Sequence, residues 1–207
     1  SRMRALSPFN PPVQRLVHML KYQGKTSVGR ALGREMGVRL RGAELVKRGA
    51  IIVPVPLHGS RRRERGYNQS ALIARAAGRQ MGLPVREDVL KRTRHTHTQT
   101  VLDQDGRRSN VAGAFRVRKE DAVRDRPILL VDDVLTTGAT VNECAEALIE
   151  AGAGPISVAV IASPYFEEPE GRNHEIHEKH EREAGRDGKS LSSDRVPGCA
   201  STDTDRT

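Results

Sequence analysis

Residues 128–140, ILLVDDVLTTGAT, are the stretch from which the fold and the chemistry of this chain can be inferred. Four apolar residues open the stretch and predict a buried strand, which ends in the acidic pair Asp132 and Asp133. The small residues of the TTGAT turn then predict the start of a helix. A helix N-terminus presents unpaired backbone N–H groups and the positive end of the helix dipole, so the turn predicts a phosphate-binding loop.

The acidic pair beside this turn indicates what the phosphate is attached to. Each carboxylate accepts O–H hydrogen bonds, and two of them suit the adjacent hydroxyl groups of a sugar. The turn and the pair together predict a ribose 5-phosphate site. The alternative is that the acids only lie at the edge of the sheet and that a threonine of the turn is an ordinary helix cap. The complete motif at residues 128–140 disfavours this alternative. The residues expected to bind are Asp132, Asp133, Thr136, Thr137, Gly138, Ala139 and Thr140.

Outside this stretch, helical and extended patterns alternate along the chain. Apolar strands interleaved with helices predict an α/β fold with a mainly parallel sheet flanked by helices. Ligands bind beyond the carboxyl ends of the strands in such sheets, where the acidic pair is expected. Apolar spacing predicts helices over residues 11–22, 27–40, 67–82 and 138–151. Strands are predicted over residues 50–57 (ending at the first proline), 85–91, 113–118, 127–134 and 156–162.

Composition divides the chain of 207 residues into three parts. Residues 1–49 predict a small N-terminal helical segment, and residues 50–163 predict the α/β core. Residues 1–163 hold 28 basic and 15 acidic residues, a net charge of +13, whereas residues 164–207 hold seven and eleven, a net charge of −4. The second segment has only eight apolar residues in 44, without a period, and therefore predicts a mostly disordered tail.

Several classes of protein are disfavoured by the same composition. No apolar run approaches the roughly 18 residues of a membrane span, and no signal peptide opens the chain. Two cysteines, Cys144 and Cys199, make neither a disulfide framework nor a four-ligand zinc site. These features predict a cytoplasmic protein. The basic charge favours a polyanionic partner, and the low aromatic content disfavours recognition by base stacking.

The string at 128–140 resembles the motif that binds phosphoribosyl pyrophosphate (PRPP) in type I phosphoribosyltransferases, and further segments resemble their ComF family, whose members are associated with competence. The resemblance covers roughly residues 13–163. ComF proteins commonly begin with a cysteine-rich zinc-finger segment, and no CxxC pair is present here; either this copy lacks the segment or the chain as given starts after it. The matching segments are Lys21–Gly24 (KYQG), Val53–Leu57 (VPVPL), Arg65–Gln69 (RGYNQ), Gln99, Arg107–Asn110 and Gly113–Phe115.

The resemblance implies a type I phosphoribosyltransferase-like fold and a set of roles for individual residues. It implies a pyrophosphate loop at Leu57, His58, Gly59, Ser60 and Arg61, with Arg65 nearby. A solvated basic loop or a nucleic-acid patch is the alternative for these arginines. The loop 92–112 would close over bound PRPP, with Arg94 and Arg107 as the catalytic residues. Magnesium ion (Mg²⁺) would enter with PRPP, and the only side chains considered for it are Asp132 and Asp133.

The implied activity is transfer of a phosphoribosyl group from PRPP to an unassigned acceptor, with release of pyrophosphate, linked to DNA uptake. A second hypothesis is a non-catalytic sensor of PRPP or nucleotides that binds single-stranded DNA or a DNA-uptake helicase. An RNA-binding regulator on the same fold is a third. Fold class alone does not choose among these hypotheses.

Several other residues carry weaker patterns. The pair His95 and His97, and the series His174, His177 and His180, have the spacing of metal ligands, but exposed loop and tail residues are the favoured interpretation. Cys144 is expected to be a buried small residue. Lys21 and Tyr22 match the family signature without an evident physical role. Asn68 and Gln69 either cap the following helix or hold the arginine loop by hydrogen bonds.

Overall fold

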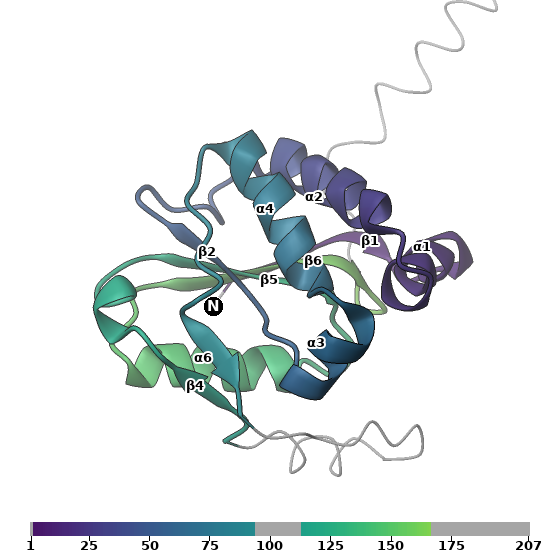
Figure 1. The fold of residues 1–207 in the computed structure, drawn as a ribbon. Helices are drawn as coiled ribbons and strands as arrows, with labels where there is room; N and C mark the ends of the chain where they lie inside the picture. The colour runs from purple at the N-terminus through teal and green to yellow at the C-terminus, as the bar shows by residue number, and fades with distance from the viewer. Residues whose placement is uncertain (1, 94–112, 167–207) are drawn as a thin grey trace, which may run out of the picture. The chain divides into compact units, whose positions relative to one another are not determined.

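The central sheet has four strands, all parallel, in the order β1-β6-β5-β2 (Figure 1). The computed structural model describes residues 2–93 and 113–166 of the chain. The parallel pairing confirms the α/β class that alternating strands and helices predict. Most of the tail expected from residue 164 onward lies outside the described residues. The strands are β1 (Arg2–Pro8), β2 (Ile51–Pro54), β5 (Ile128–Val134) and β6 (Ile156–Ser163).

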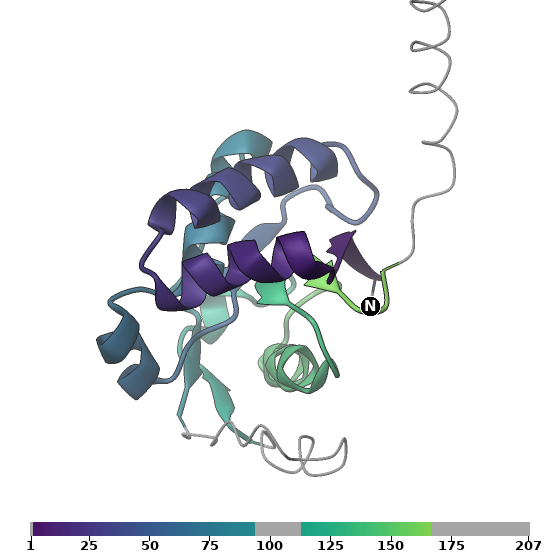
Figure 2. The ribbon, with the colours of Figure 1, turned by 90° about the vertical axis from the view of Figure 1, so that its right-hand side faces the viewer.

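Helices cover both faces of this sheet (Figures 1 and 2). One face carries α1 (Pro11–Tyr22), α2 (Thr26–Leu40) and α4 (Gln69–Met81). The other carries α6 (Ala139–Glu150) and an antiparallel hairpin. The short helix α3 precedes α4 along the chain. The remaining elements are β3 (Leu90–Arg92) and β4 (Phe115–Val117) of the hairpin, α3 (Gly59–Arg65) and the single 3₁₀ turn η1 (Glu120–Ala122).

The central strand β5 divides its side chains between two hydrophobic clusters. Ile128 and Leu130 pack with Cys144 and Leu148 of α6. Leu129 and Val131 pack in the cluster that contains residues of α1, α2 and α4. Successive side chains of a strand point to opposite faces, so a strand buried on both faces is apolar throughout. The unbroken run ILLV follows from this double burial, and Cys144 is buried as expected.

The strand β1 is not predicted by the sequence pattern. It pairs with β6 alone in the four-stranded sheet, and most of its residues are exposed or only partly buried. An edge strand needs no continuous apolar run, so Arg2 and Arg4 are tolerated within it. Residues 1–49 are therefore not helical throughout: they contribute a sheet strand before the two expected helices.

Two further differences concern the segments that follow β2. The strand expected over residues 85–91 is reduced to one bridge between Ile52 and Val85, and β3 begins only at Leu90. The segment expected as a loop continues as α3 from Gly59. The remaining helices lie within one or two residues of their predicted bounds. Among the described residues, no helix is long and apolar enough to cross a membrane.

Candidate functional site

Asp132 and Asp133 lie at the carboxyl end of β5, and both are buried. The hydroxyl group of Ser70 donates a hydrogen bond to Oδ1 of Asp132 at 2.7 Å, and the backbone N–H of Asp133 donates to the same oxygen at 2.8 Å. Ser70 lies in the first turn of α4 and is itself fully buried. The first turn of α4 therefore orients Asp132.

Burial has a strong effect on Asp132. Desolvation is the largest cause and the neighbouring charge of Asp133 the second, and together they raise the pKa of Asp132 to about 7. The hydrogen bond from Ser70 and the ammonium group of Lys21 act in the opposite direction. The carboxyl group of Asp132 is therefore harder to ionise than an exposed aspartate.

Asp133 is held by an ion pair with Lys21. The distance from Nζ of Lys21 to Oδ2 of Asp133 is 2.6 Å, and the contact is an ion pair rather than a directed hydrogen bond. The Asp133 side chain is 4% exposed and that of Lys21 is 25% exposed. Lys21 is in the last turn of α1, so this helix delivers a cation to the end of β5. The ion pair gives the lysine of the KYQG segment a physical role that sequence reasoning missed.

The TTGAT turn connects β5 to α6 as expected. Gly138 is the N-cap of α6 and has a φ of 78°, a left-handed conformation that favours glycine. No side chain among the described residues caps this helix. The first backbone N–H groups of α6 therefore lack the usual side-chain acceptor. Thr136 is exposed, and Thr137, Ala139 and Thr140 are half-buried beside these N–H groups.

The arginine segment after β2 differs in shape from the expected loop. Only Leu57 and His58 of the predicted set remain outside helix α3, which contains Gly59, Ser60, Arg61 and Arg65. The ring of His58 caps this helix, since Nδ1 accepts a hydrogen bond from the Ser60 N–H at 3.3 Å. At the other end, Gly66 ends the helix with a φ of 81°. A cap on each side allows this short charged run to form a helix.

Asn68 and Gln69 each fill one of the two roles considered for them: Asn68 caps the following helix, and Gln69 holds the arginine segment. Oδ1 of Asn68 accepts from the Ser70 N–H at 3.1 Å and so caps α4, while its Nδ2 donates to the Val55 carbonyl oxygen at 2.9 Å. Oε1 of Gln69 accepts from Nη1 of Arg65 at 2.6 Å. The first residue joins α4 to the end of β2, and the second holds the arginine helix.

The RGYNQ and KYQG segments meet in space although more than 40 residues separate them. The hydroxyl group of Tyr67 donates to the backbone carbonyl of Leu20, and the guanidinium carbon of Arg65 lies 5.8 Å from the centre of the Tyr22 ring. Lys21 lies between these two contacts along α1. The two segments together therefore fix the position of the lysine that pairs with Asp133.

Arg94 and Arg107, expected to be catalytic, lie outside the described residues, as do both groups of histidines considered as metal ligands. The chain on either side of residues 94–112 is described. The Thr93 N–H donates to the Ala114 carbonyl at 2.8 Å, and the Gly113 N–H donates to Oε2 of Glu143 at 2.8 Å. The two ends of this segment therefore lie side by side, next to α6.

A resident metal ion held by protein side chains alone does not fit the described part of the chain. No group of three or more His, Cys, Asp or Glu side chains there is arranged to hold an ion. Asp132 and Asp133 provide two carboxylates, one bonded to Ser70 and the other paired with Lys21. This donor set suits at most an ion that brings most of its oxygen ligands with it.

Comparison with known proteins supports an assignment of family. A family model described as "Phosphoribosyl transferase domain" matches residues 36–181. Competence protein F of Haemophilus influenzae is 33% identical over 161 residues, which are 76% of this chain and 70% of that protein. DNA utilization protein YhgH of Escherichia coli K12 is 35% identical over 163 residues, with the same coverage. Competence protein ComFC of Bacillus subtilis is 31% identical over 103 residues, which are 49% of this chain and 39% of that protein.

Solved structures resemble this chain less closely than the sequence relatives do. The protein TT1426 from Thermus thermophilus has a TM-score of 0.42 and 14% identity, and the match covers 70% of this chain and 86% of that one. Adenine phosphoribosyltransferase from Leishmania donovani has a TM-score of 0.40 and 14% identity, with 83% and 81% covered. The assignment below rests on the family model and the sequence relatives.

A parallel sheet with an acidic pair and a glycine turn at the end of its central strand defines a phosphoribosyltransferase-like domain. The sequence relatives narrow this class further. The chain belongs to the phosphoribosyl transferase domain family and, within it, to the ComF family. The resemblance found in the sequence is thereby confirmed.

Proposed function

We propose that this protein binds PRPP at the carboxyl end of β5 and transfers its phosphoribosyl group to an acceptor, with release of pyrophosphate, in a process that serves DNA uptake. The observation that carries the proposal is the buried pair Asp132 and Asp133 next to the uncapped N-terminus of α6. The names of the relatives, a competence protein and DNA utilization proteins, support the link to DNA.

Different parts of the proposed site would bind different groups of PRPP. The backbone N–H groups of Gly138, Ala139 and Thr140 would bind the 5-phosphate, together with the hydroxyl groups of Thr136 and Thr137. The carboxyl groups of Asp132 and Asp133 would accept hydrogen bonds from the ribose hydroxyls. The ion pair with Lys21 holds the Asp133 carboxylate in place in this structure. The ribose would therefore approach a carboxylate that is already oriented.

Transfer requires that the bond from C1 to the pyrophosphate oxygen breaks while a bond from C1 to a nitrogen of the acceptor forms. Basic side chains of the arginine segment, Arg61 and Arg65 among them, would neutralise the charge that develops on the leaving group. Mg²⁺ would supply further neutralisation when bound with PRPP. The sparse donor set of the protein would suit an ion that retains several water ligands.

Isothermal titration of PRPP into the protein, with Mg²⁺ present, tests the binding step. The double substitution Asp132→Asn and Asp133→Asn should reduce the affinity for PRPP by more than about tenfold, because it removes two charge-assisted acceptors. A matched control is Asp121→Asn with Asp125→Asn, which removes two exposed carboxylates before β5. Unchanged affinity in the first variant would refute the site assignment.

Release of pyrophosphate from PRPP over a panel of nucleobases tests the transfer step. Stimulation by one base, lost in the Asp132 and Asp133 double variant, is the expected result. PRPP binding without release on any base would favour the second candidate, a sensor that acts on single-stranded DNA or on a helicase. The net charge of +13 over residues 1–163 and the names of the DNA-related relatives favour that candidate.

A further inference from the structure

The ion pair between Lys21 and Asp133 brings a cation to the acidic pair in a largely buried place. Asp133 is buried, and Lys21 is only partly exposed. Surface ion pairs of this chain are different: the side chains of Lys119 and Asp88, for example, are 56% and 43% exposed. Exposed pairs contribute little to stability, whereas removal of one member of a buried pair leaves a costly unpaired charge. Lys21 is therefore the charge partner on which the buried Asp133 carboxylate depends.

Contacts on both sides of Lys21 fix the last turn of α1 at this place. The hydroxyl group of Tyr67 donates to the carbonyl oxygen of Leu20, and the guanidinium carbon of Arg65 lies 5.8 Å from the centre of the Tyr22 ring. The residue before the lysine and the residue after it are thus each held by the RGYNQ segment. The ammonium group of Lys21 is delivered to the acidic pair by packing of two helices, and not by a side chain that sweeps over the surface.

Groups of the protein occupy one oxygen of each carboxyl group of the acidic pair. Oδ1 of Asp132 accepts from the Ser70 hydroxyl and from the Asp133 N–H, and Oδ2 of Asp133 lies 2.6 Å from Nζ of Lys21. The charges of Arg92 and Asp132 also interact. A divalent ion that bridged the two carboxylates would be close to the ammonium group, and like charges repel strongly at short range. A metal ion at this pair would therefore have to displace a cation that the fold already supplies.

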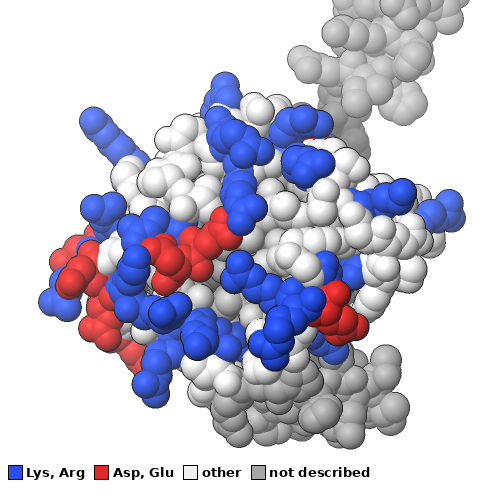
Figure 3. Space-filling model, in the orientation of Figure 1, with Lys and Arg blue, Asp and Glu red and all other residues white. Residues whose placement is uncertain are grey.

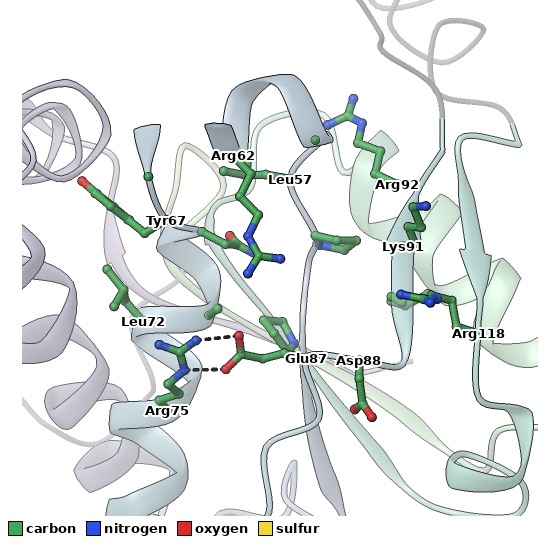
Figure 4. Close-up of a pocket in the computed structure, with 17 residues that line it drawn as sticks. Leu57, Arg62, Tyr67, Leu72, Arg75, Glu87, Asp88, Lys91, Arg92 and Arg118 are labelled. Atoms are coloured by element: carbon green, nitrogen blue, oxygen red, sulfur yellow. Dashed lines mark hydrogen bonds and ion pairs between the residues drawn. The ribbon is translucent and has the colours of Figure 1, made fainter. Parts of the chain in front are cut away.

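Carboxylates at the pyrophosphate end of the proposed site are paired in the same way. A cavity of about 310 Å³ lies there, lined by Arg62 and by residues of the expected pyrophosphate loop (Figure 4). Its two acids both have cations: Glu87 is bonded to Arg75 (dashed lines in Figure 4), and Asp88 is bonded to Arg86. Among the described residues that line this cavity, no carboxylate is left without a cation. A metal ion at this end would take its oxygen ligands from PRPP and from water.

We propose that Lys21 is the resident cation of the acidic pair and fills the role that a divalent metal ion could otherwise have at two buried carboxylates. The protein therefore binds no divalent ion at Asp132 and Asp133 in the absence of PRPP. Lys21 acts on the ligand through Asp133 and is thus a positioning residue. Its effect on PRPP binding rests on the proposed function, whereas the exclusion of a metal ion does not.

Manganese ion (Mn²⁺), a paramagnetic substitute for Mg²⁺, tests the exclusion of a metal ion. It is titrated into the full chain without PRPP at about pH 8, above the pKa of about 7 of Asp132. The wild-type chain should bind no Mn²⁺ at the acidic pair. Lys21→Met leaves two buried carboxylates without their ammonium group and should bind Mn²⁺ more than about tenfold more tightly than the wild-type chain. Adding Asp133→Asn should abolish this new site. Electron paramagnetic resonance of the free ion measures the binding.

Two control variants separate the role of the charge from that of the side chain. Lys21→Arg keeps a cation and should gain no Mn²⁺ site. Lys119→Met removes an ion-paired lysine at the surface, where Asp88 keeps Arg86 as a partner, and should gain none either. The proposal is overturned by a wild-type Mn²⁺ site that Asp132→Asn with Asp133→Asn abolishes, a result that needs no variant of Lys21 to fold. A Lys21→Met chain that is folded by circular dichroism and gains no Mn²⁺ site also overturns it.

Calorimetric titration of PRPP with Mg²⁺ present tests the positioning role. Lys21→Met should weaken PRPP binding by more than about tenfold, and Lys21→Arg should retain most of the affinity, because a cation still orients Asp133. A wild-type chain that binds no PRPP would count against the proposed function and leave the Mn²⁺ result standing. If the wild-type chain and Lys21→Met bind PRPP equally well, the positioning role is wrong and the proposed function is unaffected.

Discussion

At the scale of single residues, the two adjacent acids Asp132 and Asp133 have different interaction partners. Asp132 accepts hydrogen bonds from Ser70 and from the Asp133 backbone, and its pKa is raised mainly by burial. Asp133 instead receives the ammonium group of Lys21. The carboxyl pair therefore has a donor from α4 on one member and a cation from α1 on the other. Each partner comes from a helix, and both helices lie on the same face of the sheet (Figure 2).

The raised pKa of Asp132 predicts a pH dependence of stability. The folded protein holds this proton more tightly than the unfolded chain, whose ordinary value is 3.8. The contribution of Asp132 to the free energy of unfolding is therefore complete below about pH 4 and is lost as pH rises toward about 7. Urea unfolding at several pH values, without ligand, should show a steeper decline for the wild-type protein than for Asp132→Asn. Parallel curves would contradict the assignment.

The ion pair of Lys21 predicts a second effect at this scale. Lys21→Met leaves Asp133 buried without its cation and should lower the free energy of unfolding by roughly 3 kcal/mol, because a buried charge without a partner is costly. Adding Asp133→Asn removes that charge and should recover much of the loss. Chemical denaturation of both variants at neutral pH measures this. If the double variant is as unstable as Lys21→Met, the lysine stabilises the fold through packing of its methylene groups and not through the ion pair.

At the scale of elements, the close contact between α2 and α4 sets the frame for the site. Gly33 and Gly37 are buried on α2 against α4. A Cβ atom at Gly33 would lie 2.7 Å from Cβ of Ala76 and still closer to the Ile73 carbonyl oxygen. The two helix backbones thus approach at distances that only glycine allows. Because α4 begins at the cap Asn68 and carries Ser70, this packing helps to position the partner of Asp132.

Gly33→Ala should therefore force the two helices apart and lower the free energy of unfolding by about 1–3 kcal/mol, as overpacking does. Gly29→Ala is the matched control in the same helix. Its Cβ would meet chiefly the flexible end of Leu20 at 3.0 Å, so the loss should be smaller. Thermal unfolding of both variants tests the comparison. The better helix propensity of alanine acts equally at both positions, so an equal loss in the two would contradict the role of the contact with α4.

At the scale of the whole molecule, the dominant property is the excess of positive charge. The chain carries a net charge of +9. On the face shown in Figure 3, most charged side chains are Lys or Arg, interrupted by smaller acidic groups. The proposed PRPP site explains only some of these residues. The remainder leaves a surface suited to a polyanion.

If this surface binds single-stranded DNA, the affinity must depend steeply on salt. Neutralising about four phosphates gives a slope of about −3 in the plot of log K against log salt concentration. Fluorescence anisotropy of a labelled oligonucleotide, titrated with the full chain between about 50 and 200 mM salt, measures this slope. Absence of binding at the lowest salt would exclude single-stranded DNA as a direct partner. A DNA-uptake helicase would then be the remaining candidate for a partner.

Much of the fold and part of the site could be predicted from local patterns. The run ILLV, the acids after it and the glycine turn predict a strand, its end and a helix start, because each depends on neighbours along the chain. The strand β1 escaped prediction because an edge strand needs little apolar character. Helix α3 escaped it because a short charged run becomes helical here through caps at His58 and Gly66.

The sequence by itself determined the class of fold, the family and the place of the acidic pair, since these depend on hydrophobic period and on a local motif. Only the tertiary structure decided which groups meet that pair. Ser70 and Lys21 come from helices distant in the chain, and their contacts with Asp132 and Asp133 exist only once α1 and α4 pack on the sheet. Long-range packing leaves no periodic trace in a sequence, so the sequence pattern could not show these contacts.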